Sequence, residues 1–464
     1  MASRYDDVMS LSVRRGFLWP AVDLYGGFSG FYDYGHHGAR LKRKWEDLWA
    51  SYFLGLGDNY HLIDTTTILP EAPLKASGHV DHFTDILVTC TKCKGELGPS
   101  RPFNMMFPVG VGPLGQDRAF LRPETAQGVF LNFKREFEAL RRRLPMGLAI
   151  VGRAYRNEIS PRQGAYRMRE FLQAELQIFF DPATFGASLP VDSVRGESLR
   201  VARAGEKAAP TANDRTVADL IRDGLPPFYA YHMALVQRFY LDRLRIPRER
   251  FRFAELDEKE RAFYNKVHFD IQVSQDSLGG FKEVGGVHYR TDHDLSGHSR
   301  GSGKDLSVPV ADRKVVPHVL ELSFGVDRNV WALLDLAYEL AGERSVLHLP
   351  PALAPVVVGV FPLLSKQGMP ERAEALYRDV RSTLDAFYDD SGSIGKRYAR
   401  MDEVGTPYCV TVDHTTLEDG TVTLRERDTM GQVRVPGTSL GTILQDLLGG
   451  RRSLRDLGPP VSRP

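Results

Sequence analysis

The sequence has few cysteines, no long apolar run and almost no net charge. Its three cysteines among 464 residues cannot build a disulfide framework, so a reducing compartment, the cytoplasm, is expected. No apolar run reaches the length that spans a bilayer, and the opening MASRYDDVMS lacks the apolar segment of a signal peptide, so no membrane partner is expected. A formal net charge of +1 argues against nucleic-acid binding through bulk positive charge, but it does not exclude local basic patches.

The rest of the composition is that of a folded protein with two or three domains, 42% hydrophobic and 26% charged. A proline-rich segment at 347–356, LHLPPALAPV, predicts a domain boundary. After it, short apolar strands alternate with helical patterns, including one over 370–388, which predicts a separate α/β domain. Between about 182 and 226 the composition shifts to Ala, Gly, Arg and Asp, which predicts an insertion or a surface excursion.

The segment RNEISPRQGAYRMREF (156–171), followed by LQAELQIFF, predicts a strand, a loop and a second strand. In the second strand Gln173, Glu175 and Gln177 share one face and apolar residues share the other, as expected where the polar face lines a site. Gly152 and Ala154, on the first strand, leave room for a ligand. Four arginines lie in or beside the loop: Arg156, Arg162, Arg167 and Arg169. They suit an anionic ligand, because guanidinium groups bind phosphate through two parallel hydrogen bonds. A salt-bridged hairpin is the alternative for this segment alone.

Two further patterns carry candidate residues. Glu321, Ser323 and Gly325 alternate onto one face of a short strand that leads into a helix predicted over 326–340. Residues 40–54 place large apolar side chains at helical spacing, which core packing within a monomer explains.

Four long stretches, in the same order along the chain, resemble class II aminoacyl-tRNA synthetases, and most closely glycyl-tRNA synthetases. They are LRPETAQGVFLNF (121–133), the 156–171 segment as motif 2, PHVLELSFGVDR (317–328) as motif 3, and FYDDSGSIGKRYARMDEVGTPYCVTVD (387–413). The resemblance implies an α/β (α+β) fold: a class II antiparallel sheet flanked by helices in 1–345, with insertions at about 75–115 and 182–268. An α/β anticodon-binding domain in 353–450 and a flexible tail in 451–464 would follow. It further implies a homodimer that ligates glycine to its tRNA through a glycyl-adenylate, contacting the acceptor end and the anticodon. In the family the helix that matches 40–54 and the segment before it form motif 1 at the dimer interface, which explains the apolar pattern of 40–54 as well as core packing does.

For ATP, the resemblance implies that Arg156 meets the α-phosphate, that Arg328 meets the γ-phosphate, and that Phe171 stacks on adenine. Glu158 would help to place the adenine or the acceptor end, which makes Arg156, Glu158 and Arg328 the expected catalytic residues. The full set expected around ATP is Arg156, Asn157, Glu158, Tyr166, Arg167, Met168, Arg169, Glu170, Phe171, Glu283, Val284, Gly325 and Arg328. Glu283 is also the expected Mg²⁺ ligand, since Mg²⁺ prefers carboxylate and phosphate oxygens.

For glycine, the resemblance implies acids around the ammonium group, Ser323 near the α-carbon, and Arg290 facing the carboxylate. Such a site is physically sensible, because glycine has no side chain to bind and larger residues must be excluded sterically. The expected residues are Glu124, Phe171, Gln173, Glu175, Arg290, Glu321, Ser323 and Gly325.

Several features leave alternatives open. Cys90 and Cys93 have the spacing of half a zinc site, with His79 and His82 upstream, but two accessible thiols in a loop explain them as well. Compared with the family, His36-His37 and Leu322 each stand where a proline is usual, and the chain is shortened around 95–99. A class II synthetase for serine, proline or threonine, or a non-catalytic accessory subunit, are the rival functions.

Overall fold

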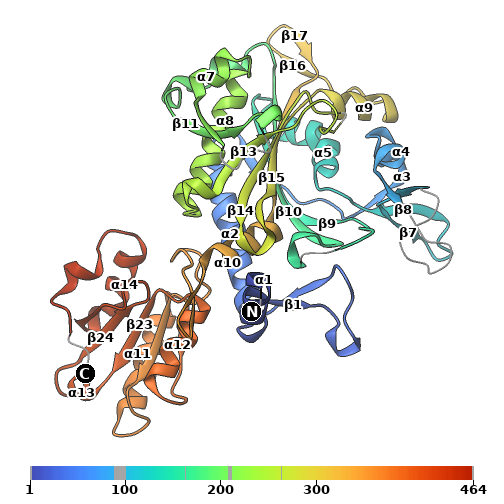
Figure 1. The fold of residues 1–464 in the computed structure, drawn as a ribbon. Helices are drawn as coiled ribbons and strands as arrows, with labels where there is room; N and C mark the ends of the chain where they lie inside the picture. The colour runs from blue at the N-terminus through green and yellow to red at the C-terminus, as the bar shows by residue number, and fades with distance from the viewer. Residues whose placement is uncertain (1–2, 88–100, 162–163, 207–211, 263, 462–464) are drawn as a thin grey trace. The chain divides into compact units, whose positions relative to one another are not determined.

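The computed structural model describes residues 3–87, 101–161, 164–206, 212–262 and 264–461 (Figure 1). The chain divides into two compact units. The larger unit comprises Pro20–Tyr32 and Glu46–Trp331, and the smaller unit comprises Met1–Trp19, Asp33–Trp45 and Ala332–Pro464. Among the described residues, no helix combines the length and apolar character of a membrane span.

A nine-stranded sheet forms the centre of the larger unit, in the order β12-β11-β13-β14-β15-β18-β10-β9-β3. Its middle is antiparallel throughout: β14 (Val267–Gln275), β15 (Gly280–Thr291), β18 (His318–Gly325), β10 (Glu170–Phe180) and β9 (Met146–Tyr155). At the edges, β3 (Tyr60–Leu62) runs parallel to β9, and β11 (Ser198–Ala202) runs parallel to β13 (Phe251–Glu255), with β12 (Asn213–Thr216) outermost. The expected antiparallel sheet is confirmed. The segment that the composition set apart, 182–226, supplies β11 and β12 of this sheet.

Helices cover the sheet because the strands present apolar residues on alternate positions. Phe130 and Phe133 of α5 (Ala126–Ala139) pack against Phe179 of β10. Trp49 and Phe53 of α2 (His36–Leu54) pack against Phe324 of β18. Leu41, Trp45, Trp49 and Phe53 are all fully buried within the protomer, so core packing accounts for the helical pattern of 40–54.

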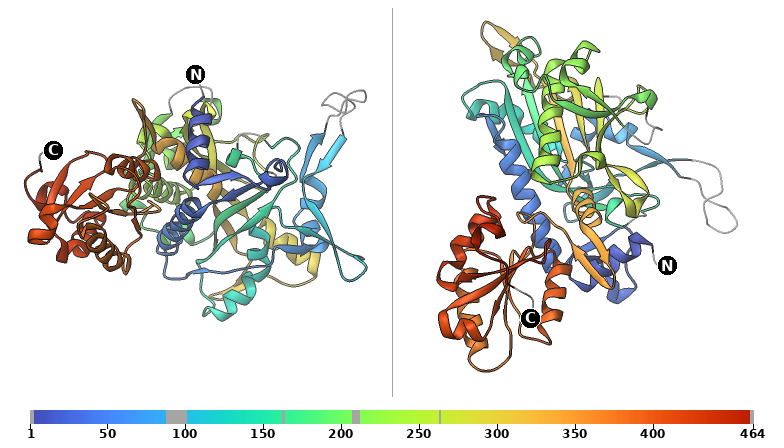
Figure 2. Two further views of the ribbon diagram at one scale, coloured as in Figure 1. Left: turned by 90° about the horizontal axis from the view of Figure 1, so that it is seen from below. Right: turned by 60° about the vertical axis from the view of Figure 1, so that its left-hand side comes forward.

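The C-terminal sheet has the order β22-β21-β23-β24-β25, and it confirms the predicted α/β architecture (Figure 2). Strands β21 (Val358–Pro362), β22 (Ala386–Tyr388) and β23 (Tyr408–Val412) are parallel, whereas β24 (Thr421–Glu426) and β25 (Gln432–Pro436) are antiparallel. Helices α11 (Met369–Arg381) and α14 (Leu440–Leu448) pack on one face. Helix α12 (Ile394–Val404) packs on the other, where Cys409 is buried.

Two predicted helices are too long. Helix α10 (Val326–Ala337) ends before 340, because Tyr338–Ala341 form strand β19 against β20 (Arg344–Leu347). The pattern over 370–388 also ends early, since residues 386–388 pair with β21 as strand β22. In both places hydrogen bonding to another strand overrides local periodicity.

The remaining elements are short. The smaller unit begins with α1 (Arg4–Arg14), and β1 (Leu18–Pro20) pairs with β2 (Tyr32–Tyr34). The other short helices are α3 (Glu71–Ala76), α4 (His79–His82), α6 (Phe185–Ser188), α7 (Val217–Arg222), α8 (Pro227–Arg238), α9 (His293–Ser302) and α13 (His414–Asp419). The other short strands are β4 (Ile68–Pro70), β5 (Thr84–Leu87), β6 (Arg101–Asn104), β7 (Phe107–Val111), β8 (Asp117–Leu121), β16 (Val308–Val310) and β17 (Arg313–Val315).

Candidate active site

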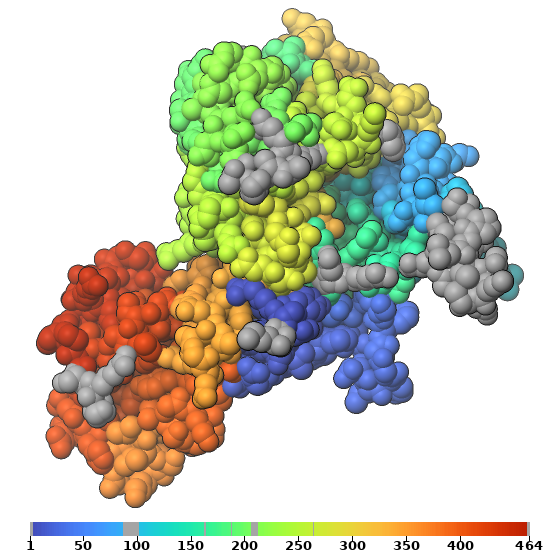
Figure 3. All heavy atoms as spheres, in the orientation of Figure 1, coloured from blue at the N-terminus to red at the C-terminus, as the bar shows by residue number. Residues whose placement is uncertain are grey.

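A cavity of about 210 Å³ lies on the polar face of the nine-stranded sheet. In the space-filling view, the yellow-green surface around β13–β15 lies beside the teal surface around β9 and β10 (Figure 3). The cavity is lined by residues from β10, β15, β18, the loop after β9, the first turn of α10, the segment before α5 and the loop before β14: Glu124, Arg156, Glu158, Ala165, Tyr166, Arg167, Met168, Phe171, Leu172, Gln173, Glu175, Tyr264, Glu283, Gly285, Gly286, His288, Glu321, Ser323, Gly325, Asp327 and Arg328.

Strand register explains why these residues meet. Glu175 of β10 lies opposite Ser323 of β18, and Gln177 lies opposite Glu321. On the other side of β18, Ser323 pairs with Gly286 of β15. Because side chains alternate along a strand, residues in such cross-strand rows point to the same face.

Three buried acids occupy one end of the cavity. Glu175 accepts hydrogen bonds from Thr125 Oγ1 at 2.7 Å and Ser323 Oγ at 3.1 Å, and Glu321 accepts one from Gln177 Nε2 at 2.8 Å. Burial, together with the charges of Glu321 and Glu124, raises the pKa of Glu175 to about 8. A cavity that crowds carboxylates in this way favours a cationic ligand.

The other two acids respond differently to the same crowding. Burial raises the pKa of Glu321, although the Arg290 guanidinium opposes the rise. Burial also disfavours the charged form of Glu124, but His79 and Arg290 outweigh it and hold the pKa of Glu124 well below its usual range. His79 Nε2 lies 3.5 Å from the Glu124 carboxylate.

Arg290 lies behind this acidic end and does not line the cavity. It donates to both oxygens of Asp294 at 2.8 and 2.9 Å and to Glu321 Oε2 at 2.9 Å. Its guanidinium also lies over the ring of Tyr264, 4.1 Å from the centroid. Only 1% of the Arg290 side chain is exposed, so its charge acts on the acids that face the cavity.

Arginines and aromatic rings form the opposite end. The Arg156 guanidinium lies over the rings of Phe171 and Phe83, 5.4 and 5.3 Å from their centroids, and donates to the Pro123 carbonyl at 3.1 Å. Arg328 pairs with Glu283 at 2.9 Å and lies 4.7 Å over the ring of Tyr166.

The loop after β9 adds Arg167, which pairs with Glu158 at 2.8 Å and is half exposed. Cationic groups held by neighbouring acids and rings, with part of their surface open, are suited to bind phosphate.

Most residues expected around ATP and glycine line this one cavity, but five do not. Arg169 donates to the carbonyls of Glu158 and Ser29, Glu170 pairs with Arg153, and the Val284 carbonyl accepts from Asn329. Asn157 donates its backbone N–H to the Met105 carbonyl, and Arg290 is the fifth.

The expected space beside Gly152 is also filled. A Cβ at that position would lie 2.2 Å from Arg122 Nη2, so a protein side chain, rather than a ligand, occupies the room that the glycine leaves.

Sequence reasoning missed several lining residues. Tyr264 comes from a loop without periodic pattern, so no sequence signal pointed to it. Asp327 directly precedes Arg328 in motif 3, and its carboxylate accepts the Leu172 N–H at 2.6 Å, which ties the start of β10 to α10. His288 was detectable, since it lies two residues before Arg290 and shares its face of β15.

The zinc hypothesis concerns Cys90 and Cys93, which lie outside the described residues. Within the described part of the chain, no group of three or more His, Cys, Asp or Glu side chains is arranged to hold a metal ion.

Sequence comparison decides the family. Glycine–tRNA ligases from Methanothrix thermoacetophila, Aeropyrum pernix and Methanothermobacter thermautotrophicus are 34%, 34% and 35% identical to this chain. The alignments cover 99%, 98% and 96% of this chain and 99% of each relative. The chain belongs to the glycine–tRNA ligase family.

Residues 357–447 of this glycine–tRNA ligase family member match the family described as "Anticodon binding domain". The predicted family is therefore confirmed. The alignment with the Methanothrix ligase runs over 577 positions, and this chain has 464 residues. At more than a hundred aligned positions, therefore, the relative has a residue and this chain has a gap.

Proposed function

We propose that this cavity forms glycyl-adenylate from glycine and ATP and then transfers the glycyl group to the acceptor end of tRNA. As a member of the glycine–tRNA ligase family, the chain is an aminoacyl-tRNA synthetase of protein synthesis. The observation that carries the site assignment is the separation of groups along the strands: Glu175 and Glu321 lie within β10 and β18, whereas Phe171 lies at the start of β10 and Arg328 follows the end of β18. Glycine and ATP have the matching charges, an ammonium group on one and phosphates on the other.

The arginine end is assigned to ATP. Phe171 offers a flat face to adenine, Arg156 meets the α-phosphate that the glycine carboxylate attacks, and Arg328 and Arg167 meet the outer phosphates. Adenylate formation needs in-line positioning of carboxylate and α-phosphate and neutralisation of the charge that develops, and no protein nucleophile. Arg156 is held by Phe171, Phe83 and the Pro123 carbonyl, so little reorganisation is needed when ATP binds.

The acidic end is assigned to the glycine ammonium group. Glu124, Glu175 and Glu321 would bind it, and Ser323, hydrogen-bonded to Glu175, would lie beside the α-carbon and exclude a larger side chain. Arg290 supports this end indirectly, through its bonds to Glu321 and Asp294. A role of Arg290 on the glycine carboxylate requires the guanidinium to leave these partners.

Mg²⁺ accompanies ATP in this family's reaction. Glu283 fits the role of its protein ligand, because its carboxylate lies on the cavity wall and is about half exposed. The bound ion would supply charge neutralisation on the phosphates. Glu283 would then exchange its present partner, Arg328, for the ion, which leaves that guanidinium to the phosphate oxygens.

The remaining assignments concern the tRNA and the assembly. The anticodon is assigned to the C-terminal α/β domain, on the family match to 357–447, with the domain boundaries at about 345 and 353. A homodimer is supported by the segment between β1 and β2, where Leu24 and Tyr25 are 97% and 88% exposed. The low cysteine content keeps the cytoplasm as the expected compartment.

Aminoacylation of total tRNA, with each amino acid supplied separately, tests the function. Charging with glycine alone is expected. Charging with serine, proline or threonine would overturn the assignment of the acidic end, and no charging by folded protein would favour an accessory subunit.

A further inference from the structure

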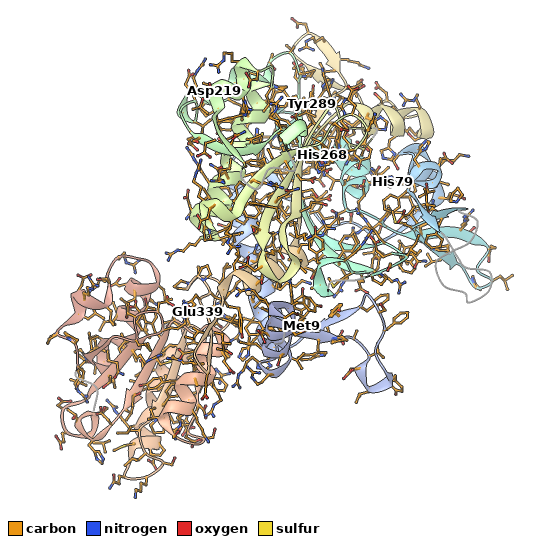
Figure 4. The ribbon with its side chains drawn as sticks, viewed as in Figure 1. Met9, His79, Asp219, His268, Tyr289 and Glu339 are labelled. Atoms are coloured by element: carbon orange, nitrogen blue, oxygen red, sulfur yellow. The ribbon has the colours of Figure 1, made fainter. Side chains whose placement is uncertain are left out.

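The cavity residue His288 has no part in the proposed assignments. His288 of β15 lies opposite Glu321 of β18 in the strand register, and on its other side it pairs with His268 of β14. Figure 4 labels His268 within these strands. Gln177, Glu321, His288 and His268 therefore form one cross-strand row on the polar face of the sheet.

The two oxygens of Glu321 have different surroundings. Oε2 accepts hydrogen bonds from Gln177 Nε2 at 2.8 Å and Arg290 Nη1 at 2.9 Å. Oε1 is approached by His288 Nε2 at 3.6 Å. Since Oε2 already has two donors, Oε1 is the oxygen with capacity to accept from an ammonium group.

Two neighbours of His288 favour a proton on Nε2. Asn265 Nδ2 lies 3.1 Å from Nδ1, which accepts from it in this orientation of the amide, and Nε2 faces the Glu321 carboxylate at 3.6 Å. Burial, the neighbouring His268 and Arg290 lower the pKa of His288 well below its usual value, which keeps the ring neutral. The ring is packed in place, because its centroid lies 4.0 Å from that of His268.

The position of the ring adds a further constraint. A Cβ built on Gly286 would lie 2.4 Å from His288 Nε2, so the imidazole nitrogen sits directly over Gly286, the residue opposite Ser323. The donor therefore lies beside the place assigned to the glycine α-carbon and ammonium group. A contact of 3.6 Å is slightly longer than a hydrogen bond, and such contacts in unliganded sites commonly tighten when substrate binds.

We propose that His288 is a positioning residue for glycine binding, whose Nε2–H holds Glu321 Oε1 toward the substrate ammonium group. This inference rests on the proposed function of the same cavity. The proposed hydrogen bond from His288 is made to Glu321, so its loss should lower the affinity for glycine and leave ATP binding unchanged.

Replacing His288 by glutamine or by asparagine tests whether the Nε2–H donor matters, because each substitution removes the ring and places an amide nitrogen at a different position. The side-chain nitrogen of His288→Gln falls near the position of Nε2, whereas that of His288→Asn falls near Nδ1. His288→Gln is expected to keep the KM for glycine within about threefold of the parent, while His288→Asn and His288→Ala raise it about tenfold, as for one lost hydrogen bond to a charged group. The kcat and the KM for ATP should stay within about twofold of the parent values, since the substitutions remove one hydrogen bond at the glycine end.

His318→Gln is the matched control. His318 is a hydrogen-bonded histidine on β18, three residues before Glu321 and therefore on the opposite face, and it does not line the cavity. The KM for glycine of the His318→Gln variant should equal that of the parent. Steady-state pyrophosphate exchange with glycine and ATP varied separately, and thermal unfolding of each variant, give the comparison.

Equal KM values for the Gln and Asn variants would overturn the positioning role, as would a parallel rise in the KM for ATP. If the unsubstituted protein showed no glycine-dependent exchange, the proposed function itself would fail. Normal exchange with unchanged KM values in all His288 variants would remove this inference alone.

Discussion

At the scale of single residues, the proposed chemistry depends on charge held in place before substrate arrives. The Arg156 guanidinium is fixed between two rings and a carbonyl. Preorganised charge of this kind favours a transition state, since the protein does not have to reorient during the reaction.

Arg156→Ala should reduce glycine-dependent pyrophosphate exchange by about 10²- to 10³-fold, the usual cost of removing one preorganised donor. The protein should stay folded, because the Arg156 side chain is partly exposed and makes one carbonyl hydrogen bond. Exchange rates and a thermal melt test this. An Arg156→Ala protein with the exchange rate of the parent would contradict the assignment of the arginine end to ATP.

The raised pKa of Glu175 predicts a proton release. In the free protein Glu175 is largely protonated at pH 7, since its pKa is about 8. Binding of an ammonium group favours the ionised form, so glycine binding should release a proton, and the KM for glycine should fall by about tenfold between about pH 6.5 and 8.5. Calorimetry in buffers of different ionisation enthalpy measures the released proton. Binding without proton release would contradict the assignment.

The same group predicts how stability depends on pH. Its folded-state pKa lies above the usual value of 4.5, so the folded state binds more protons than the unfolded state between about pH 4.5 and 8. The Glu175 contribution to stability is therefore lost as pH rises through that window. The free energy of unfolding of Glu175→Gln, minus that of the parent, should therefore be larger at about pH 8 than at about pH 5, as measured by urea denaturation. An equal effect at both pH values would argue against a raised pKa.

At the scale of elements, the alternation of side chains along strands predicted which residues face the cavity. The period of two placed Glu175 with Gln173, and Glu321 with Ser323, on one face, and the structure brings both pairs to the same cavity. Partners distant in sequence were not predictable. Asp294 lies four residues after Arg290, but the second carboxylate that binds Arg290, that of Glu321 on β18, comes from another strand, and the sequence alone does not show that the two meet.

Gly152→Ala tests the packing of one element. The new Cβ would lie 2.2 Å from the buried guanidinium of Arg122, which donates to the carbonyls of Arg153 and Thr65. We expect a loss of about 1–3 kcal/mol in the free energy of unfolding, as for other overpacked sites.

Chemical denaturation measures this loss. Gly395→Ala in α12 is the control, because a Cβ there meets nothing within 4 Å and alanine favours a helix. Equal stability of Gly152→Ala and the parent would show that Arg122 can move aside.

At the scale of the whole molecule, the sequence identified the family from motifs and the structure supplied the arrangement. The antiparallel sheet and the α/β C-terminal domain agree with the expectation from the sequence. Strand β12 was not foreseen, because it carries only polar residues in its sequence, NDRT, and joins the sheet at its edge. The composition of an edge strand of this kind does not differ from that of a loop.

The proposed dimer gives a prediction at this scale. Leu24, Tyr25 and Phe28 form an exposed apolar tip, and this segment is tied to the motif 2 loop by Arg169, which donates to the Ser29 carbonyl. The protein should sediment at twice its chain mass of 52.0 kDa, and replacing Leu24 and Tyr25 by serine should increase the monomer fraction. An unaltered dimer would place the interface elsewhere.

The central claim is that one cavity activates glycine and no other amino acid. Pyrophosphate exchange into ATP, measured with purified protein, Mg²⁺ and each amino acid in turn, tests it most directly. We predict exchange with glycine alone, and its loss in Glu321→Gln, which removes a charge that the ammonium group requires. Exchange supported by another amino acid, or glycine-dependent exchange that survives in Glu321→Gln, would contradict this claim.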